Sequence, residues 1–444
     1  MGRKPSTREL AVWVNGTRVG TWRIPSRGEE EFQYDPTWIQ ADQARPLSLS
    51  LPISLDNTPL RGRVVHNYFD NLLPDSEPIR QRIQQRFHTR SQQAFDLLSA
   101  IGRDCVGAAQ ILPVAEAPGD IHQVDVEPLS EAQIEASLVQ HTAVSTLHGL
   151  GDQDFRISIA GAQEKSAFTF HNGQWCKPLG ATPTTHIFKL PLGRIGGIQA
   201  DMTQSVENEW LCSRVVNAYG IPVAKTEMGQ FGAQKVLIVE RFDRELDVSH
   251  SYWLRLLQED MCQASGFPPT EKYESEGGPG VLEICQLLQG SRTRDTDLEN
   301  FFKAQILFWL LAAGDGHAKN FSIRILPQGR YQLTPLYDVI SYFPIVGPGA
   351  NQIPEQDITM AMSMRGKNKH YRRSEIRRRH FNQTAARCGV GKSAEHLISD
   401  LISKTPGVVE AVVGDLPNGF PSLVADKVLG GLQASVEALG AMEA

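Results

Sequence analysis

The chain has 444 residues, a length that corresponds to about three domains of ordinary size. Hydrophobic residues make up 41% of the chain and charged residues 21%, a balance typical of globular proteins. With 44 basic and 50 acidic side chains, the net charge is −6, which excludes a globally basic nucleic-acid binder but allows a local basic patch.

Targeting and cysteine patterns exclude further classes of protein. The longest apolar run covers the eight residues 306–313 and is too short to span a bilayer. The charged start of the chain lacks the apolar core of a secretory signal. Six widely spaced cysteines without a C-x-x-C pair favour neither a zinc site nor a disulfide framework. We therefore expect a reduced, cytoplasmic protein with no membrane partner.

The first block, residues 1–129, is predicted to be an N-terminal domain that mixes helices and strands. It opens with a hairpin whose turn is Asn15–Gly16, and two helical patterns follow within residues 74–100. The segment 112–129 is rich in proline and acidic residues and has no apolar period, so we place a domain boundary there.

Two further blocks predict a two-lobed arrangement with a cleft. Residues 130–246 contain one helix, 205–219, stopped by Gly220 and Pro222, and short strands at 154–160, 165–171, 185–192 and 235–242. Residues 247–444 are mainly helical, with one embedded hairpin at 321–336.

The densest polar cluster is DGHAKN, residues 315–320. It follows an apolar helix that we expect to end at Gly314 in a left-handed cap. Asp315 precedes Asn320 by five residues, the spacing of the protein-kinase catalytic loop, where the Asp accepts the substrate hydroxyl proton and the Asn reaches Mg²⁺. The alternative is a turn in which both side chains bind backbone donors.

Asp338 and Lys189 add two further elements of a kinase site. Asp338 lies 18 residues after Asn320, and the intervening hairpin returns the chain to the loop, so the two oxygen ligands suit Mg²⁺. Lys189 lies in an apolar strand, like the kinase lysine that binds the α- and β-phosphates and pairs with a helix glutamate. Glu207 and Glu209 are both candidates for that glutamate. The alternative for Asp338 is a turn residue at the end of a strand. The alternative for Lys189 is a lysine at a strand edge whose ammonium group reaches water.

A phosphate loop and a hinge are the last two predicted elements, and all of the elements follow one another along the chain as they do in protein kinases. The segment 158–165 is a strand–loop–strand pattern in which backbone N–H groups and Lys165 can meet phosphates, although its single glycine matches neither common phosphate-loop motif. The buried strand ending at Glu240 occupies the place of a hinge that presents backbone groups to adenine. Read alone, the segment 158–165 predicts only a β-hairpin.

At this point the sequence resembles a known family, HipA, the serine/threonine-kinase toxins of bacterial HipBA toxin–antitoxin systems. The likeness runs nearly end to end, and the stretches that carry it are ARPLSLSLP, NYFDNLLPDS, FDLLSAIGRD, ISIAGAQEK, PTTHIFKLP, QSVENE, VERFDR, QEDMCQ, KYESEGGPG and DGHAKNFS.

The resemblance implies roles for individual residues. Asp315 would be the catalytic base, Asn320 and Asp338 would hold Mg²⁺, and Lys189 would bind the ATP phosphates. Ser158 would be autophosphorylated, which ejects the phosphate loop and silences the kinase. The remaining ATP-binding positions would be the phosphate loop Ala160, Gly161, Ala162, Gln163, Glu164 and Lys165, the hinge Glu240, Arg241 and Phe242, and the nucleotide-site residues His317, Lys319 and Tyr337.

The resemblance also implies cofactors and partners. They are ATP and Mg²⁺, a HipB-like helix-turn-helix antitoxin, and operator DNA reached through the antitoxin complex. The implied protein substrate is glutamyl-tRNA synthetase, whose phosphorylation arrests translation and growth and promotes persistence.

A basic run at residues 365–380 holds eight Lys or Arg against one acid. We expect its second half, 371–380, to be helical. It is either a solvated face or a surface for phosphate-backbone contact with DNA, with Arg377, Arg378 and Arg379 as candidate contacts.

These features together predict an α+β, two-lobed protein-kinase-like fold with an added N-terminal domain and a mainly helical C-terminal lobe. The predicted activity is transfer of the ATP γ-phosphate to a protein serine. Two alternatives stay open: a small-molecule kinase of related fold, and a DNA-associated corepressor in which ATP is structural.

Overall fold

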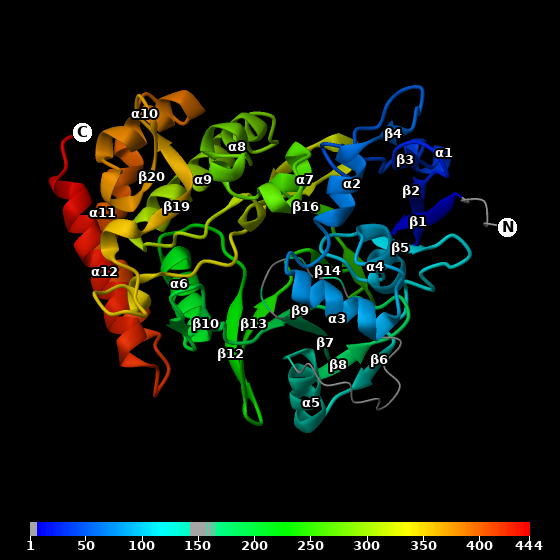
Figure 1. Ribbon diagram of the computed structural model, residues 1–444, viewed down its shortest axis with the longest axis horizontal. Helices are drawn as coiled ribbons and strands as arrows, with labels where there is room; N and C mark the ends of the chain where they lie inside the picture. The colour runs from blue at the N-terminus through cyan, green and yellow to red at the C-terminus, as the bar shows by residue number, and fades with distance from the viewer. Residues whose placement is uncertain (1–6, 143–157, 159, 161–162, 164) are drawn as a thin grey trace.

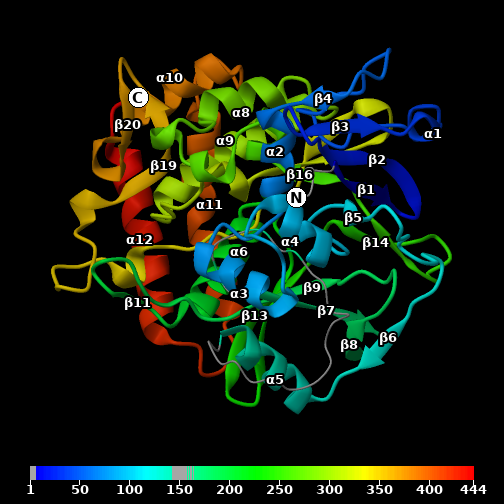
Figure 2. The ribbon, with the colours of Figure 1, turned by 45° about the vertical axis from the view of Figure 1, so that its right-hand side comes forward.

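The computed structural model describes residues 7–142, 158, 160, 163 and 165–444. Figure 1 shows the N-terminal sheet at the upper right, a second sheet in the lower part and the C-terminal helices on the left. The turned view of Figure 2 shows the N-terminal strands again at the upper right and the C-terminal helices again on the left. No helix within these described residues combines the length and the hydropathy needed to cross a membrane.

The N-terminal domain is a five-stranded antiparallel sheet, ordered β4-β3-β2-β1-β5, covered by short helices. The predicted hairpin is confirmed, because Asn15 and Gly16 have φ values of 45° and 75°, as a type I′ turn requires. Trp22 stacks on Phe69 in the core, with ring centroids 3.9 Å apart. The elements are β1 (Arg8–Val14), β2 (Thr17–Ile24), β3 (Glu31–Tyr34), α1 (Pro36–Ile39), β4 (Leu60–Arg61), α2 (Arg63–Asp70), α3 (Glu77–Phe87), α4 (Ala94–Ile101) and β5 (Gln110–Pro113).

The second region is a six-stranded antiparallel sheet in the order β12-β13-β9-β7-β8-β6. Its strands are β6 (Val126–Pro128), β7 (Lys165–His171), β8 (Gln174–Pro178), β9 (His186–Lys189), β12 (Thr226–Phe231) and β13 (Gln234–Glu240). A small hairpin, β10 (Gly193–Ile195) and β11 (Ala200–Met202), lies beside it. The predicted helix is confirmed as α6 (Ser205–Ala218), and Gly220 follows it with φ of 80°.

Alternation along β13 places one helix on each face of this sheet. Val236 and Ile238 pack into a core with α5 (Glu131–Thr142), whereas Leu237 and Val239 pack into the core that contains α6. Lys189 pairs in register with Leu237, so its side chain lies on the α6 face.

The C-terminal lobe is mainly helical, as predicted, but it holds more strands than the one expected hairpin. The hairpin gains a third strand, and two further hairpins, β14–β15 and β19–β20, were missed. The helices are α7 (Met261–Ser265), α8 (Val281–Leu288), α9 (Arg294–Leu310), α10 (Arg378–Cys388), α11 (Glu395–Gly414) and α12 (Ser422–Ala441). The strands are β14 (Arg244–Leu246), β15 (Trp253–Arg255), β16 (Gln258–Asp260), β17 (Ser322–Ile325), β18 (Tyr331–Leu333), β19 (Thr359–Arg365) and β20 (Lys369–Arg372).

One strand that lies before the predicted domain boundary at residue 129 pairs with the second sheet. Val126–Pro128, expected in the N-terminal domain, pairs with β8 and so extends the second sheet. The segment between β5 and β6 therefore connects the two sheets.

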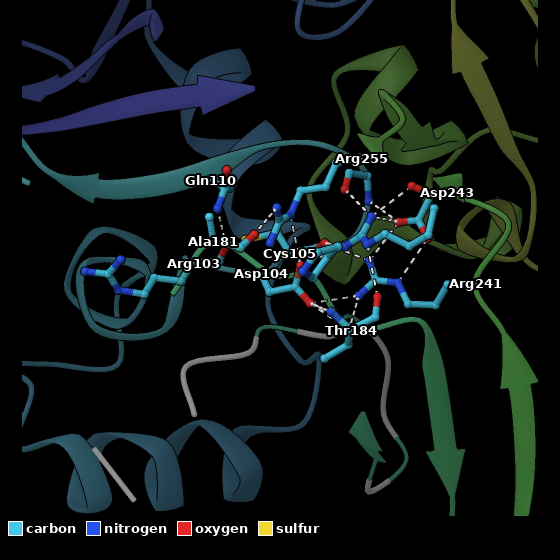
Figure 3. Close-up of polar contacts among 12 residues, drawn as sticks. Arg103, Asp104, Cys105, Gln110, Ala181, Thr184, Arg241, Asp243 and Arg255 are labelled. Atoms are coloured by element: carbon cyan, nitrogen blue, oxygen red, sulfur yellow. Dashed lines mark hydrogen bonds and ion pairs between the residues drawn. The ribbon is translucent and has the colours of Figure 1, made fainter. Parts of the chain in front are cut away.

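A buried ion network joins the N-terminal domain to both lobes (Figure 3). The carboxylate of Asp104 accepts hydrogen bonds from Arg244 at 2.9 Å, Arg255 at 3.1 Å and Thr184 at 2.6 Å. Arg241 donates to Asp104 at 3.3 Å and to Asp243 at 2.7 Å. Burial alone would raise the pKa of Asp104, but the three guanidinium groups outweigh it and hold the pKa below its ordinary value.

The network places three guanidinium groups around two carboxylates at sites that solvent hardly reaches. The three arginine side chains are at most 2% exposed. Further N–H groups of these arginines donate hydrogen bonds to the backbone carbonyls of Cys105, Gly107 and Ala181. Because an unpaired charge at this depth would be strongly unfavourable, the network fixes the N-terminal domain against the start of the C-terminal lobe.

Candidate active site

A cavity of about 550 Å³ opens where the three regions meet. The structure brings most of the predicted site residues into its lining. These are Ala160, Gln163, Lys165, Lys189, Glu240, Arg241, Phe242, Asp315, His317, Lys319, Asn320, Tyr337 and Asp338. Of the predicted phosphate loop, Gly161, Ala162 and Glu164 lie outside the described residues.

Lys189 forms the central ion pairs of the cavity. Its Nζ lies 2.6 Å from Oε1 of Glu209 and 2.7 Å from Oδ1 of Asp338, and its side chain is 7% exposed. Burial alone would lower the pKa of Lys189, but the two carboxylates outweigh it and hold the pKa above its ordinary value. Glu207 binds Lys235 instead, which settles the choice between the two glutamates.

Asp338 is placed beside the catalytic loop by the hairpin β17–β18, as the sequence predicts. Nδ2 of Asn320 donates to the backbone oxygens of Asp315 at 3.1 Å and Asp338 at 3.3 Å. Asp338 has φ of 62°, in the left-handed region that costs a non-glycine residue energy. The ammonium groups of Lys189 and Lys165 outweigh burial and hold the pKa of Asp338 below its ordinary value.

The turn that leads into the catalytic loop differs from the prediction. Helix α9 ends at Leu310, and Ala312, with φ of 49°, adopts the left-handed conformation that was expected at Gly314. Gly314 is needed for a different reason: a Cβ there would lie 2.5 Å from the backbone oxygen of Thr359. The close packing of these segments delivers Asp315 to the cavity, where the residue is exposed.

His317 and Lys319 line the cavity from the same loop. Burial lowers the pKa of His317 to about 4, so its ring is neutral at pH 7. Nζ of Lys319 lies 2.7 Å from Oδ1 of Asn71 and 3.1 Å from Oδ2 of Asp260. The catalytic loop is thereby attached to the N-terminal domain as well as to its own lobe.

Sequence reasoning missed several residues that line the same cavity. Asn71 and Asp75 come from the N-terminal domain, and Asp75 forms an ion pair with Lys272 at 3.0 Å. These two residues, and the lining residues Asp260 and Lys272, occur in the stretches 67–76, 258–263 and 272–280, which entered the sequence analysis only through the family resemblance. No spacing rule connects segments about 200 residues apart, and the resemblance was the only available signal.

Hydrogen bonds hold the described residues at both ends of the phosphate-loop segment. Nζ of Lys165 donates to the backbone oxygen of Ala160 at 2.9 Å, and Gln163 donates to the backbone oxygen of Leu190. Ser158 is 1% exposed, and its Oγ donates to the backbone oxygen of Leu72 at 2.7 Å. The Ser158 hydroxyl therefore lies against the N-terminal domain and away from solvent.

The segment after β13 has the form expected of a hinge. The N–H of Arg241 donates to the oxygen of Thr185 at 2.9 Å, and the N–H of Phe242 has no hydrogen-bond partner within the described part of the chain. Ile187 and Val239 add apolar walls to the cavity. A planar heterocycle with one acceptor nitrogen would match this free N–H and these walls.

Asn320 and Asp338 have the chemistry that a magnesium ion requires. The amide nitrogen of Asn320 is held by two backbone oxygens, so its Oδ1 is the atom left to coordinate. Lys189 contacts Oδ1 of Asp338, and no residue in the described ranges donates a hydrogen bond to Oδ2. Hard oxygen donors in this number suit Mg²⁺, which completes its shell with phosphate oxygens and water.

The basic run has a different structure from the one predicted. Residues 371–380 were expected to be helical, but β20 occupies 369–372, a 3₁₀ turn follows at Arg373–Glu375, and α10 begins at Arg378. Arg378 is bound to Glu395 at 2.5 Å, whereas Arg377 and Arg379 are exposed. The hairpin register with β19 competes with helix formation here, and only part of the run is free to contact a partner.

The two glutamates of α6 provide a matched test of the Lys189 pair. Glu209→Gln removes a buried partner of Lys189 and is expected to weaken ATP binding about tenfold or more. Glu207→Gln disturbs a pair whose lysine is 48% exposed and is expected to change affinity less than about twofold. Calorimetric titration with ATP and Mg²⁺ measures both. Equal effects of the two substitutions would contradict this assignment.

Comparison with known proteins identifies the family. Residues 10–112 match the HipA N-terminal domain and residues 157–409 match the HipA-like C-terminal domain. The protein Y4mE of Sinorhizobium fredii, whose name marks it as an inferred kinase, is 32% identical over 92% of this chain and 93% of its own. The serine/threonine-protein kinase toxin HipA of Shewanella oneidensis is 28% identical over 69% of each chain.

A solved structure has the same fold. HipA from the Shewanella oneidensis complex of HipA, HipB and operator DNA superimposes with a TM-score of 0.77 at 22% identity and covers 97% of both chains. This match confirms the predicted α+β, two-lobed fold with an added N-terminal domain. With both domain models and full-length relatives in agreement, the chain belongs to the HipA family.

Proposed function

We propose that this protein is a Mg²⁺- and ATP-dependent kinase toxin that transfers the γ-phosphate to a protein serine in the cytoplasm. The observation that carries the proposal is the contact of Lys189 with both Glu209 and Asp338 in the cavity that also holds Asp315 and Asn320. In kinases, the strand lysine, helix glutamate and metal aspartate must all be in place for phosphoryl transfer.

Each chain residue has a defined task in this mechanism. The free N–H of Phe242 and the apolar walls bind adenine, while Lys189 and Lys165 bind the phosphates. Asn320 and Asp338 would hold Mg²⁺, which neutralises charge on the phosphates when bound. Asp315 accepts the proton of the acceptor hydroxyl as the oxygen attacks the γ-phosphorus, and ADP leaves.

The proposed partners come from the relatives. The Shewanella protein is a toxin and was solved with HipB and operator DNA. We propose that this chain likewise binds a HipB-like antitoxin and acts with it as a corepressor at operator DNA. Glutamyl-tRNA synthetase is the proposed substrate, with arrest of translation and growth and with persistence as consequences. Boundaries near residues 129 and 246 are the proposed domain limits.

We also propose that Ser158 is autophosphorylated. Its hydroxyl is buried against Leu72 and its N–H donates to the oxygen of Asp104 at 3.0 Å, so it must leave this contact to accept a phosphate. A phosphate of about −2 charge does not fit the buried position. Phosphorylation would therefore displace the adjoining phosphate loop and weaken ATP binding.

Replacing the proposed base tests the activity. Asp315→Asn removes the proton acceptor but keeps size and fold, so ATP affinity is expected to stay near the wild-type value while phosphoryl transfer and growth arrest are lost. The control is Asp426→Asn, an exposed position on α12. Transfer from labelled ATP to protein in a whole lysate is the measurement. A folded Asp315→Asn protein with wild-type transfer would refute the proposal.

The exposed arginines of the basic run test DNA contact. Arg377→Glu with Arg379→Glu is expected to weaken DNA binding by the antitoxin complex and to reduce the salt slope by about 0.9 per lost phosphate contact. Arg378 is excluded because its substitution would break the Glu395 pair. Arg90→Glu with Arg292→Glu supplies an equal charge change elsewhere. If both pairs of substitutions alter the slope equally, the basic run has no specific contact.

A further inference from the structure

Tyr273 contacts the carboxylate that we assign as the base. Its hydroxyl donates a hydrogen bond of 2.6 Å to Oδ1 of Asp315. Its ring stands edge-on to His317, with centroids 5.1 Å apart and planes 86° apart. Tyr273 is half-buried, and no described residue donates a hydrogen bond to Oδ2 of Asp315. One carboxylate oxygen is thus held while the other is left for an acceptor hydroxyl.

The residue before Tyr273 is attached to the catalytic loop and to the N-terminal domain. The backbone oxygen of Lys272 accepts a hydrogen bond of 3.1 Å from the N–H of Ala318, within the loop that carries Asp315. Nζ of Lys272 lies 3.0 Å from Oδ2 of Asp75. The backbone on this side of Tyr273 therefore cannot shift without moving the loop.

The residue after Tyr273 is attached to the C-terminal lobe. Glu274 is 5% exposed and accepts hydrogen bonds from the N–H of Ser363 at 2.6 Å and from its Oγ at 2.9 Å. Nζ of Lys369 lies 3.0 Å from the same carboxylate. With neighbours fixed on both sides, the Tyr273 hydroxyl is held at one place before any substrate arrives, which is the arrangement that preorganised sites use.

The charge state of Tyr273 fits the role of a donor. Burial, and after it the charge of Asp315, raises the pKa of Tyr273 well above its ordinary value, so the phenol stays protonated at neutral pH. A protonated phenol cannot take the proton of an acceptor hydroxyl. It can only orient the carboxylate that does.

We propose that Tyr273 is a positioning residue that holds Oδ1 of Asp315 and turns Oδ2 toward the acceptor hydroxyl. This inference rests on the proposed function, because it assumes that Asp315 is the base. A misplaced catalytic group typically costs up to about 100-fold in rate, while nucleotide binding, which involves other residues, is unaffected.

The test uses the full chain and the conservative variant Tyr273→Phe, which keeps the ring against His317. Steady-state ADP release from ATP with Mg²⁺ and an excess of the proposed acceptor, glutamyl-tRNA synthetase, is expected to show kcat lowered about 10- to 100-fold, with KM for ATP and the calorimetric ATP affinity of the unphosphorylated chain unchanged. Tyr331→Phe is the matched control, because its hydroxyl also donates one hydrogen bond, 2.6 Å to the oxygen of Leu287, but outside the cavity. If Tyr273 had only a structural role, the substitution would lower the melting temperature but would not lower kcat while leaving KM unchanged.

Asp315→Asn measured alongside separates the two claims. If Asp315→Asn is inactive and Tyr273→Phe has wild-type kcat, the positioning role is overturned and the proposed function stands. If Asp315→Asn has wild-type kcat, both claims fall. Loss of ATP affinity in Tyr273→Phe, or a kcat loss of the same size in Tyr331→Phe, would also overturn the positioning role.

Discussion

The ion pairs of Lys189 are the interaction on which the cavity depends. An ammonium group this deeply buried is tolerated only with charged partners, and the two that it has come from different parts of the fold. Glu209 lies on α6, and Asp338 lies in the turn after β18, where the backbone is in the left-handed region. The pairs therefore bring the strand, the helix and the turn of Asp338 together, and the strained backbone at Asp338 is stabilised by the same contacts.

The N-terminal domain is a structural part of the site. Asp104 binds the arginines that follow the hinge, Asn71 binds Lys319 of the catalytic loop, and the backbone oxygen of Leu72 accepts the Ser158 hydroxyl. All three contacts are buried, so the domain cannot move away without exposing or unpairing polar groups. Any partner that displaces this domain would alter the proposed nucleotide hinge and the proposed catalytic loop together.

The sequence predicted the contacts that arise from local geometry. The Asn15–Gly16 turn, helix α6 and the return of Asp338 to Asn320 follow from turn chemistry, periodicity and hairpin length. The choice of Glu209 over Glu207 depends on helix rotation against the sheet, and the left-handed residue Ala312 depends on close packing around Gly314. The basic run pairs as a strand with β19, a tertiary contact that local propensity does not contain.

The central claim, transfer of a phosphoryl group from ATP to a serine, is tested most directly by locating the phosphate. The wild-type chain is incubated with Mg²⁺ and ATP, and intact-mass and peptide analysis then follow the modification over time. We expect one phosphoryl group per chain, on Ser158, with ADP formed in equal amount and ATP affinity falling as the modification accumulates. An unmodified chain that forms no ADP, alone or with a whole lysate, would contradict the account.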